Sequence, residues 1–295
     1  MSRPRFDLQS HSLHSDGALA PRAVVAAARA AGVELLALSD HDTVDGVDEA
    51  LEAAAAEGIS LVPAAELSTI HGDHEDLHVL GYLIDHRSPV LLTALERFRA
   101  DRAHRAHRMA DALRGLGFEL DFPERGDAPV GRPHLAQAVF EHPANSIRLR
   151  DEQIVNSSQL LVAYLIPGAP AYRRRTTPTV AEAIEVIHAA GGVAVWAHPF
   201  WDVDADAAVL DAIDRFAQDG LDGVEAFYVT HTERQTRLIA AHCDERGLMT
   251  TGSADFHGPD HRRFNRFLNF ELHGLEPNLG RIAQAAVRFG GGSTG

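Results

Sequence analysis

Short apolar stretches alternate with amphipathic, alanine-rich stretches along the first part of the chain. The stretches expected to form strands are a segment beginning at Phe6 and residues 33–38, 59–65 and 78–84, and those expected to form helices are residues 21–31 and 45–57. Pro21 at the start of the first helix and Gly32 just after it are typical helix boundaries. Strands that alternate with helices predict a parallel sheet with right-handed crossovers, and therefore an α/β fold.

This alternation stops at about residue 89 and returns at about residue 180. Residues 89–116 form one long helical pattern, and the segment up to residue 176 has helix-like pieces but no strand of barrel-like apolar character. We therefore expect a helical insertion over residues 89–176. The later stretches predict helices at residues 180–190, 207–218 and 233–246, and strands at residues 193–197, 223–228 and 248–251. Residues 1–88 and 177–289 are thus predicted to form one discontinuous barrel domain, and residues 290–295 a flexible tail.

Polar side chains gather where the predicted strands end. In the first strand Phe6 and Leu8 face one side while Gln9 and His11 face the other, because strand side chains alternate with period two. An α/β barrel places its chemistry at the carboxyl ends of its strands. The candidate ligands at these ends are His11, Asp16, His41, Glu66, His78, His198, Asp255 and His257. Imidazole and carboxylate groups without thiolate suit zinc, manganese or iron, so the sequence predicts a metal site.

Composition narrows the class of protein further. The 295 residues are 45% hydrophobic, which is enough for a core, and the net charge of −15 argues against a protein that binds duplex nucleic acid or anionic membranes. A single cysteine, Cys243, excludes an internal disulfide and favours a reducing compartment. The N-terminal residues lack the apolar core of a signal peptide, and no apolar run approaches membrane-spanning length. We expect a cytoplasmic protein.

Six motifs, in this order, resemble those of the PHP (polymerase and histidinol phosphatase) family of metal-dependent phosphoesterases: DLQSHSLHSDG, LSDHDT, AAEL, HVLGY, AHPF and SADFHG. The resemblance covers residues 6–88 and 177–270. The insertion resembles that of the small stand-alone nucleotide phosphatases of this family, because GRPHLA at residues 131–136 is similar to one of their motifs. The resemblance implies a distorted TIM-like (β/α)7 barrel that holds two or three divalent ions, with Mn²⁺ expected and Zn²⁺ or Fe²⁺ as alternatives.

The resemblance also implies how the ligands divide among the ions. One ion would take His11, Glu66 and Asp255, a second Glu66, His78 and His198, and a third Asp16, His41 and His257. The chain departs from the family at Gln9, which stands where the family's His-x-His motif has its first histidine. A glutamine carbonyl is a weaker, neutral ligand, so the first ion is expected to bind weakly or to be completed by water.

Substrate binding and proton transfer have fewer candidates. Arg132 and His134 in the GRPH motif are predicted to hold a substrate phosphate, because an arginine fork matches phosphate oxygens. His134 and His198 are the two candidates for proton transfer to the leaving group. The sequence does not choose between them.

The expected function is hydrolysis of a phosphate ester by metal-bound hydroxide, with cations stabilising the developing charge. The resemblance favours a small nucleotide substrate, either a 3′,5′-bisphosphate nucleotide or a short 5′-phosphorylated oligonucleotide. The alternatives are a histidinol-phosphate phosphatase and a degenerate PHP module with impaired catalysis. A metal-dependent amidohydrolase often uses a carboxylated lysine between its metals. This chain has no lysine, and Glu66 is the natural substitute for such a bridge.

Overall fold

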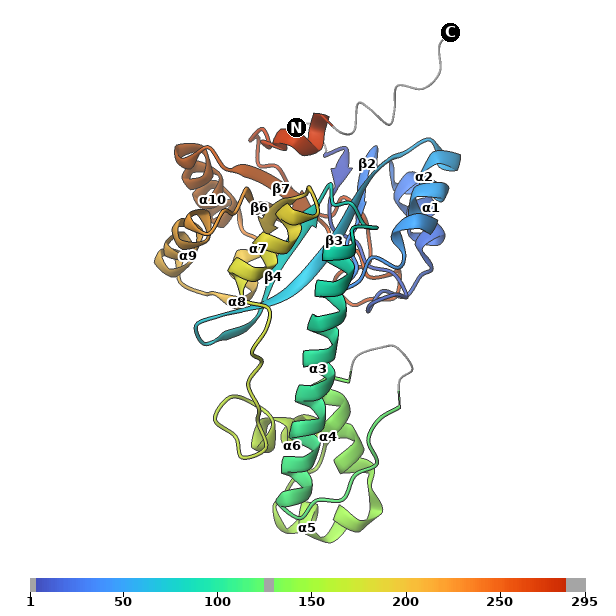
Figure 1. The fold of residues 1–295 in the computed structure, drawn as a ribbon, viewed down its shortest axis with the longest axis vertical. Coiled ribbons are helices and arrows are strands. Elements are labelled where there is room, and N and C mark those ends of the chain that lie inside the picture. The colour runs from blue at the N-terminus through green and yellow to red at the C-terminus, as the bar shows by residue number, and fades with distance from the viewer. Residues whose placement is uncertain (1–3, 125–129, 285–295) are drawn as a thin grey trace. The chain divides into compact units, whose positions relative to one another are not determined.

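The computed structural model describes residues 4–124 and 130–284, so the predicted tail at residues 290–295 lies outside the described residues (Figure 1). The chain divides into two compact units, of which the first is Met1–Leu95 with Pro178–Gly295 and the second is Glu96–Thr177. Within the described residues, no helix is long and apolar enough to cross a membrane.

The first unit contains a single sheet whose strands follow one another in chain order. They are β1 (Phe6–Asp7), β2 (Leu35–Leu38), β3 (Ser60–His71), β4 (His74–Tyr82), β5 (Val193–Trp196), β6 (Gly223–Tyr228) and β7 (Met249–Ser253). The pairs β1–β2, β2–β3, β5–β6 and β6–β7 are parallel. β4 is antiparallel to both β3 and β5.

The prediction of a parallel sheet is therefore wrong at β4. Only Gly72 and Asp73 separate β3 from β4, and Gly72 has a φ of 56° that suits a tight turn. A parallel pair needs a crossover of a dozen or more residues, whereas an antiparallel pair can be joined by two residues. The short turn thus requires a hairpin.

Hydrogen bonds between the β1 and β7 regions nearly close the sheet into a barrel. The Leu8 N–H donates to the Gly252 carbonyl at 3.2 Å, and the His11 N–H donates to the Phe256 carbonyl at 2.8 Å. The distorted seven-stranded α/β barrel predicted from the sequence is confirmed. Its closure brings residues near both ends of the described chain to one place.

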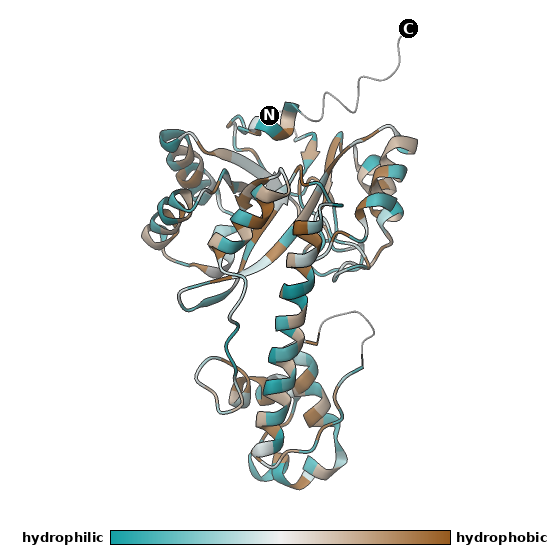
Figure 2. Cartoon of the chain, viewed as in Figure 1, coloured by the Kyte–Doolittle hydropathy of each residue, from teal (hydrophilic) through white to brown (hydrophobic). Residues whose placement is uncertain are grey.

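Helices of the first unit cover the barrel, and those that the sequence predicted begin and end within two residues of the expected positions. They are α1 (Pro21–Ala31), α2 (Val47–Glu57), α7 (Val180–Ala189), α8 (Pro199–Asp202), α9 (Asp206–Gln218) and α10 (Glu233–Arg246). α1 ends at Gly32, whose φ is 89°, and its Val24 and Ala28 pack in a core with Leu36 of β2. Figure 2 colours stretches of the strands as hydrophobic, whereas hydrophilic residues are frequent on α9 and α10.

The second unit is helical and has its own core. α3 (Pro89–Gly115) continues into it, followed by α4 (Arg132–Glu141), the 3-10 turn η1 (Pro143–Asn145), α5 (Ser146–Asp151) and α6 (Ser157–Tyr164). Met109, Leu113, Phe118, Leu135 and Leu160 are buried together there. The described residues of this unit contain no strand. The middle of α3 is hydrophilic, as Figure 2 shows.

Candidate metal centre

The eight predicted ligands all belong to the first unit, where they form one connected cluster. Ligand atoms lie within 4.8 Å of one another in three groups: His11, Asp16, His41 and His257; His41, Glu66 and His78; and His11, Glu66 and Asp255. His198 joins the cluster because its Nε2 lies 3.2 Å from Glu66 Oε1 and 3.3 Å from His78 Nδ1. The cluster therefore draws its ligand-type side chains from sequence positions between residues 11 and 257.

Glu66 lies at the centre of this cluster and is fully buried. Its Oε1 faces His78 Nδ1 at 2.8 Å and His198 Nε2 at 3.2 Å. Its Oε2 lies 3.2 Å from His11 Nε2 and 3.9 Å from His41 Nδ1. The two oxygens of one carboxylate thus face two different sets of imidazoles, an arrangement that would allow the carboxylate to bridge two cations.

The β3–β4 hairpin positions Glu66 and His78 side by side. Ser68 pairs with His78 across the two antiparallel strands, and Glu66 lies two residues from Ser68 on the same face. The predicted placement of both residues was wrong: Glu66 lies within β3, which runs on to His71, and His78 lies in the middle of β4. The Gly72-Asp73 turn is the sequence signal that indicates this longer hairpin.

Asp40 orders the loop that follows β1. Its carboxylate accepts hydrogen bonds from the Ser12 N–H and Ser12 hydroxyl, each at 2.7 Å, and from the Ser15 hydroxyl at 2.6 Å. The loop presents Asp16, whose oxygens lie 3.4 Å from His257 Nε2 and 3.7 Å from His41 Nε2. Asp40, in the SDHDT motif, therefore supports the cluster by holding a loop in place.

Asp255 is held by a tyrosine behind it. The Tyr228 hydroxyl donates to Asp255 Oδ2 at 2.8 Å, while Asp255 Oδ1 lies 3.1 Å from His11 Nε2. The φ of Asp255 is 54°, in the left-handed region that residues other than glycine rarely adopt. Such backbone strain gathers at functional sites, where the surrounding structure stabilises it.

His198 has the same kind of backbone strain, with a φ of 30°. The residues that hold it in place were not predicted from the sequence. The His198 N–H donates to Glu225 Oε2 at 3.0 Å, and the Ser253 hydroxyl donates to Glu225 Oε1 at 2.6 Å. Burial raises the pKa of Glu225 to about 8. A charged residue in the otherwise apolar strand GVEAFY was the available signal, because a fully buried carboxyl needs partners.

The donor set fits divalent cations. Among the described residues, His11 Nε2, His41 Nδ1 and Asp255 Oδ1 are buried polar atoms without a hydrogen bond. Such orphaned atoms are costly unless another partner satisfies them, and bound cations would satisfy all three. Burial lowers the pKa of His41 to about 4 and so keeps this imidazole neutral, the form that binds metals.

The two central carboxylates remain ionised. Burial alone would raise the pKa of Glu66, but the four imidazoles around its two oxygens together outweigh burial and hold that pKa well below its usual value. Burial likewise opposes ionisation of Asp255, whose pKa is lowered overall by His11 and His257. The centre therefore offers negative charge surrounded by imidazoles, a set that suits Mn²⁺, Zn²⁺ or Fe²⁺.

Gln9 presents its amide donor to this centre. Its Nε2 donates to Glu66 Oε2 at 2.7 Å, and its Oε1 lies 3.2 Å from the Ser253 hydroxyl oxygen. The ionised Glu66 favours this orientation, because the opposite one would place two oxygens against each other. In this orientation Gln9 steadies Glu66, and its carbonyl does not point to the position of a ligand.

Replacing Gln9 by histidine is expected to tighten metal binding. The imidazole would add a ligand atom beside His11 and Glu66, and changes next to metal ligands move affinity by roughly 10- to 100-fold. Metal content and the Mn²⁺ concentration at half-maximal rate measure the effect. Gln9→Leu, which has no ligand atom, serves as the control and should bind no more tightly than the wild type. Unchanged loading and rate in Gln9→His would refute the expectation.

Arg132 and His134 belong to the second unit, whereas the metal cluster belongs to the first. Both lie in the first turn of α4. The Nδ1 of His134 accepts a hydrogen bond from the Gly131 N–H at 2.9 Å and so caps the helix. One ring nitrogen of His134 therefore has a structural task, and the proton of the neutral ring lies on Nε2.

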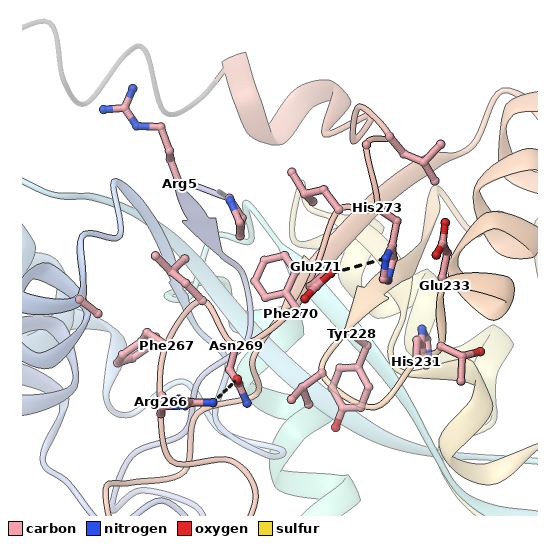
Figure 3. A pocket seen from close by; sticks show the side chains of 18 of the residues that line it. Arg5, Tyr228, His231, Glu233, Arg266, Phe267, Asn269, Phe270, Glu271 and His273 are labelled. Carbon is pink, nitrogen blue, oxygen red and sulfur yellow. Dashed lines mark hydrogen bonds and ion pairs between the residues drawn. The ribbon is translucent and has the colours of Figure 1, made fainter. Parts of the chain in front are cut away.

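A large groove lies apart from the cluster in the first unit. It has a volume of about 1130 Å³, and Arg5, His231, Arg266 and Glu271 are among the residues that line it (Figure 3). None of the eight cluster residues lines it. Tyr228 is the link, since it lines the groove while its hydroxyl reaches Asp255. This groove is thus separate from the reactive groups.

Comparison with known proteins shows the family of this chain. Residues 7–122 match the PHP domain family. The chain is 33% identical over 258 residues to a 5′-3′ exoribonuclease of Haemophilus influenzae, covering 86% of this chain and 90% of that protein. It is also 33% identical over 263 residues to a 3′,5′-nucleoside bisphosphate phosphatase of Chromobacterium violaceum, covering 86% and 87% of the two chains.

A solved structure is similar to this chain over nearly its whole length. An amidohydrolase from Chromobacterium violaceum, with bound sulfate and no metal, matches with a TM-score of 0.75 and 28% identity, over 96% of this chain and 97% of that one. The similarity therefore extends over both units of the chain.

Proposed function

Because the chain belongs to the PHP domain family, we propose that it hydrolyses a phosphate ester of a nucleotide with the help of divalent metal ions. The observation that carries the proposal is the buried, ionised Glu66 with imidazoles at both of its oxygens. Metal-dependent phosphoester hydrolysis uses clustered cations, and this carboxylate with its imidazoles offers ligands for them. The relatives named above are both enzymes that act on nucleotide phosphate esters by their names.

The finer substrate is a 3′,5′-bisphosphate nucleotide or a short 5′-phosphorylated oligonucleotide. The exoribonuclease and the bisphosphate phosphatase named above are both 33% identical to this chain, and each aligns over most of its length. A nucleotide with a phosphate ester is what the two names share. A histidinol-phosphate phosphatase has no corresponding support among these relatives, so it is the weaker alternative.

Three ions, with Mn²⁺ the expected one, are proposed to share the eight cluster residues. The proposed sets are His11, Glu66 and Asp255; Glu66, His78 and His198; and Asp16, His41 and His257. When bound, the ions would activate a water molecule and stabilise charge on the phosphoryl oxygens. The chain's own residues hold these ions in place, exclude bulk water from the buried side of the cluster, and keep Glu66 fixed through Gln9.

Proton transfer to the leaving group and binding of the substrate phosphate are proposed for residues that belong to none of these ion sets. His198 Nε2 lies within the cluster, beside Glu66 and His78, so its proposed role is that of a ligand. His134 then remains the candidate that gives a proton to the leaving group, through its Nε2. Arg132 is proposed to hold a substrate phosphate, since its fork matches phosphate oxygens.

A screen of phosphorylated compounds tests the proposed function. Purified protein with added Mn²⁺ is assayed for phosphate release from nucleoside 3′,5′-bisphosphates, 5′-phosphorylated dinucleotides and histidinol phosphate. We expect turnover of the nucleotides and little release from histidinol phosphate. Preferential hydrolysis of histidinol phosphate would favour the alternative. Absence of turnover together with absence of bound metal would instead indicate a degenerate binding module.

Replacing Arg132 by alanine is expected to raise the Michaelis constant more than it alters metal loading. Loss of a charge-assisted contact costs about 1.5–3 kcal/mol, or roughly tenfold or more in apparent affinity. Steady-state kinetics with the preferred nucleotide and metal analysis of the same samples measure both quantities. Arg150→Ala, on an exposed arginine of the same unit, is the matched control. An unchanged Michaelis constant would remove Arg132 from the site.

A further inference from the structure

A group of aromatic and cationic side chains borders the metal cluster. We call it the aromatic rim and define it as Trp201, His261, Arg263 and Phe264. The Trp201 and Phe264 rings lie 5.7 Å apart between centroids, and the Arg263 guanidinium lies over the Trp201 ring at 5.3 Å. His261 stacks on Phe264 at 5.0 Å with an angle of 12° between the rings. The four side chains thus form one contiguous group in the first unit.

The aromatic rim touches the cluster at two points. The Trp201 ring lies 6.5 Å from the ring of His198, in an edge-on arrangement. The Phe264 ring lies 5.4 Å from the ring of His257. His198 and His257 are both proposed metal ligands, so a phosphate held at the cluster lies next to the rim. In a nucleotide the ribose separates the base from the phosphate, so the base can lie on the rim while the phosphate lies at the cluster.

Trp201 is the exposed indole of the rim and can receive a base. It remains 46% exposed, while the chain's other tryptophan, Trp196, is fully buried. Scattered exposed apolar residues are normal on a protein surface. Trp201 differs from such residues because it lies beside the proposed ligand His198 and under the guanidinium of Arg263. An indole face combined with an arginine is a surface that stacks on π systems.

We propose that the aromatic rim is the subsite for the nucleobase of the substrate, with Trp201 as the stacking residue. This inference rests on the proposed function and deepens it, since it makes the base, and not only the phosphate ester, a recognised part of the substrate. Stacking accepts every base because each one has a π face. The subsite therefore selects nucleotides over sugar phosphates and leaves the identity of the base open.

A kinetic comparison tests this selection. The wild type, Trp201→Ala and Trp201→Phe are assayed with adenosine 3′,5′-bisphosphate and with ribose 5-phosphate. Loss of one base–aromatic stack lowers affinity by roughly 5- to 150-fold. The preference, measured as the ratio of kcat/KM for the nucleotide to kcat/KM for the sugar phosphate, should therefore fall by this factor in Trp201→Ala. Trp201→Phe keeps an aromatic face and should retain most of the preference. An unchanged preference in Trp201→Ala overturns the proposal.

Tryptophan fluorescence gives a second measurement that does not depend on turnover. With only two tryptophans, one buried and one in the rim, adenosine 5′-monophosphate should quench the Trp201 signal of the wild type. Ribose 5-phosphate should quench it far less, and Trp201→Phe should lose the quenching. Equal quenching by the two compounds, or quenching that persists in Trp201→Phe, contradicts the proposal.

The two measurements separate failure of the subsite from failure of the proposed function. If the protein hydrolyses nucleotides but Trp201→Ala keeps the full preference, the subsite is wrong and the function stands. If no phosphate ester is hydrolysed, the proposed function fails, whereas base-dependent quenching of Trp201 still supports the subsite. Metal analysis of each variant shows whether a change at Trp201 has disturbed His198.

Discussion

Replacing Glu66 by glutamine is expected to abolish turnover while the fold is retained. The carboxylate carries the charge that would hold two cations together, and each of its oxygens faces a different pair of histidines. An amide of the same shape has no charge and offers only one acceptor atom. Changes in residues that merely support metal ligands already cost roughly 10- to 100-fold, so we expect a loss of more than about 100-fold.

Turnover, metal content and thermal unfolding of Glu66→Gln decide this prediction together. Metal content should fall along with turnover, whereas cooperative unfolding should persist because the side chain keeps its volume. Glu57→Gln, on an exposed glutamate at the end of α2, is the control for loss of one negative charge. A Glu66→Gln protein with nearly normal metal content and rate would show that Glu66 is not a bridge.

Removal of divalent ions is expected to abolish turnover and to lower the melting temperature by about 5–10 °C. A ligand present at about 100 times its Kd stabilises the folded state by about 2.7 kcal/mol, and about 1 kcal/mol corresponds to about 2–4 °C for a chain of this size class. The buried cluster has to replace the lost cations with protons or water. This replacement leaves orphaned atoms such as His11 Nε2 and Asp255 Oδ1 without a full partner.

Thermal unfolding before and after chelation measures this effect, and re-addition of Mn²⁺ tests its reversal. Re-addition of Ca²⁺ is an informative comparison, because Ca²⁺ prefers oxygen ligands whereas the cluster is rich in imidazole. Mn²⁺ should restore both rate and melting temperature, and Ca²⁺ should restore neither fully. A chelated protein with unchanged stability and rate would rule out a metal centre at these residues.

Much of the barrel could be predicted from the sequence because its signals are local. α1 with its Pro21 start and Gly32 end, β6 as an apolar run and α10 all lie where their patterns indicate. The direction of β4 could not be predicted from apolar runs alone. Residues 66–77 carry so many polar side chains that they hide the continuation of β3 into its hairpin, and only the short Gly72-Asp73 turn indicates it.

The members of the cluster could be predicted from the sequence, but the residues that hold them in place could not. Histidines and acids that follow apolar runs are visible in the sequence. The Gln9 orientation, by contrast, depends on Ser253, which is 244 residues away in the chain. The hydrogen bond from the His198 N–H to Glu225 likewise joins two different strand regions. Such partners follow from barrel closure, so a local pattern does not contain them.

The ligand-type residues of the cluster are spread from His11 to His257, and this has a consequence for how the protein is made. A chain grows from its N-terminus, and early segments can fold while later ones are still being synthesised. Asp255 and His257 leave the ribosome after the whole second unit and nearly all of the barrel. Loading with a full set of ions must therefore await completion of the chain, and nascent fragments hold only part of the ligand set. The supply of divalent cations then acts on finished molecules.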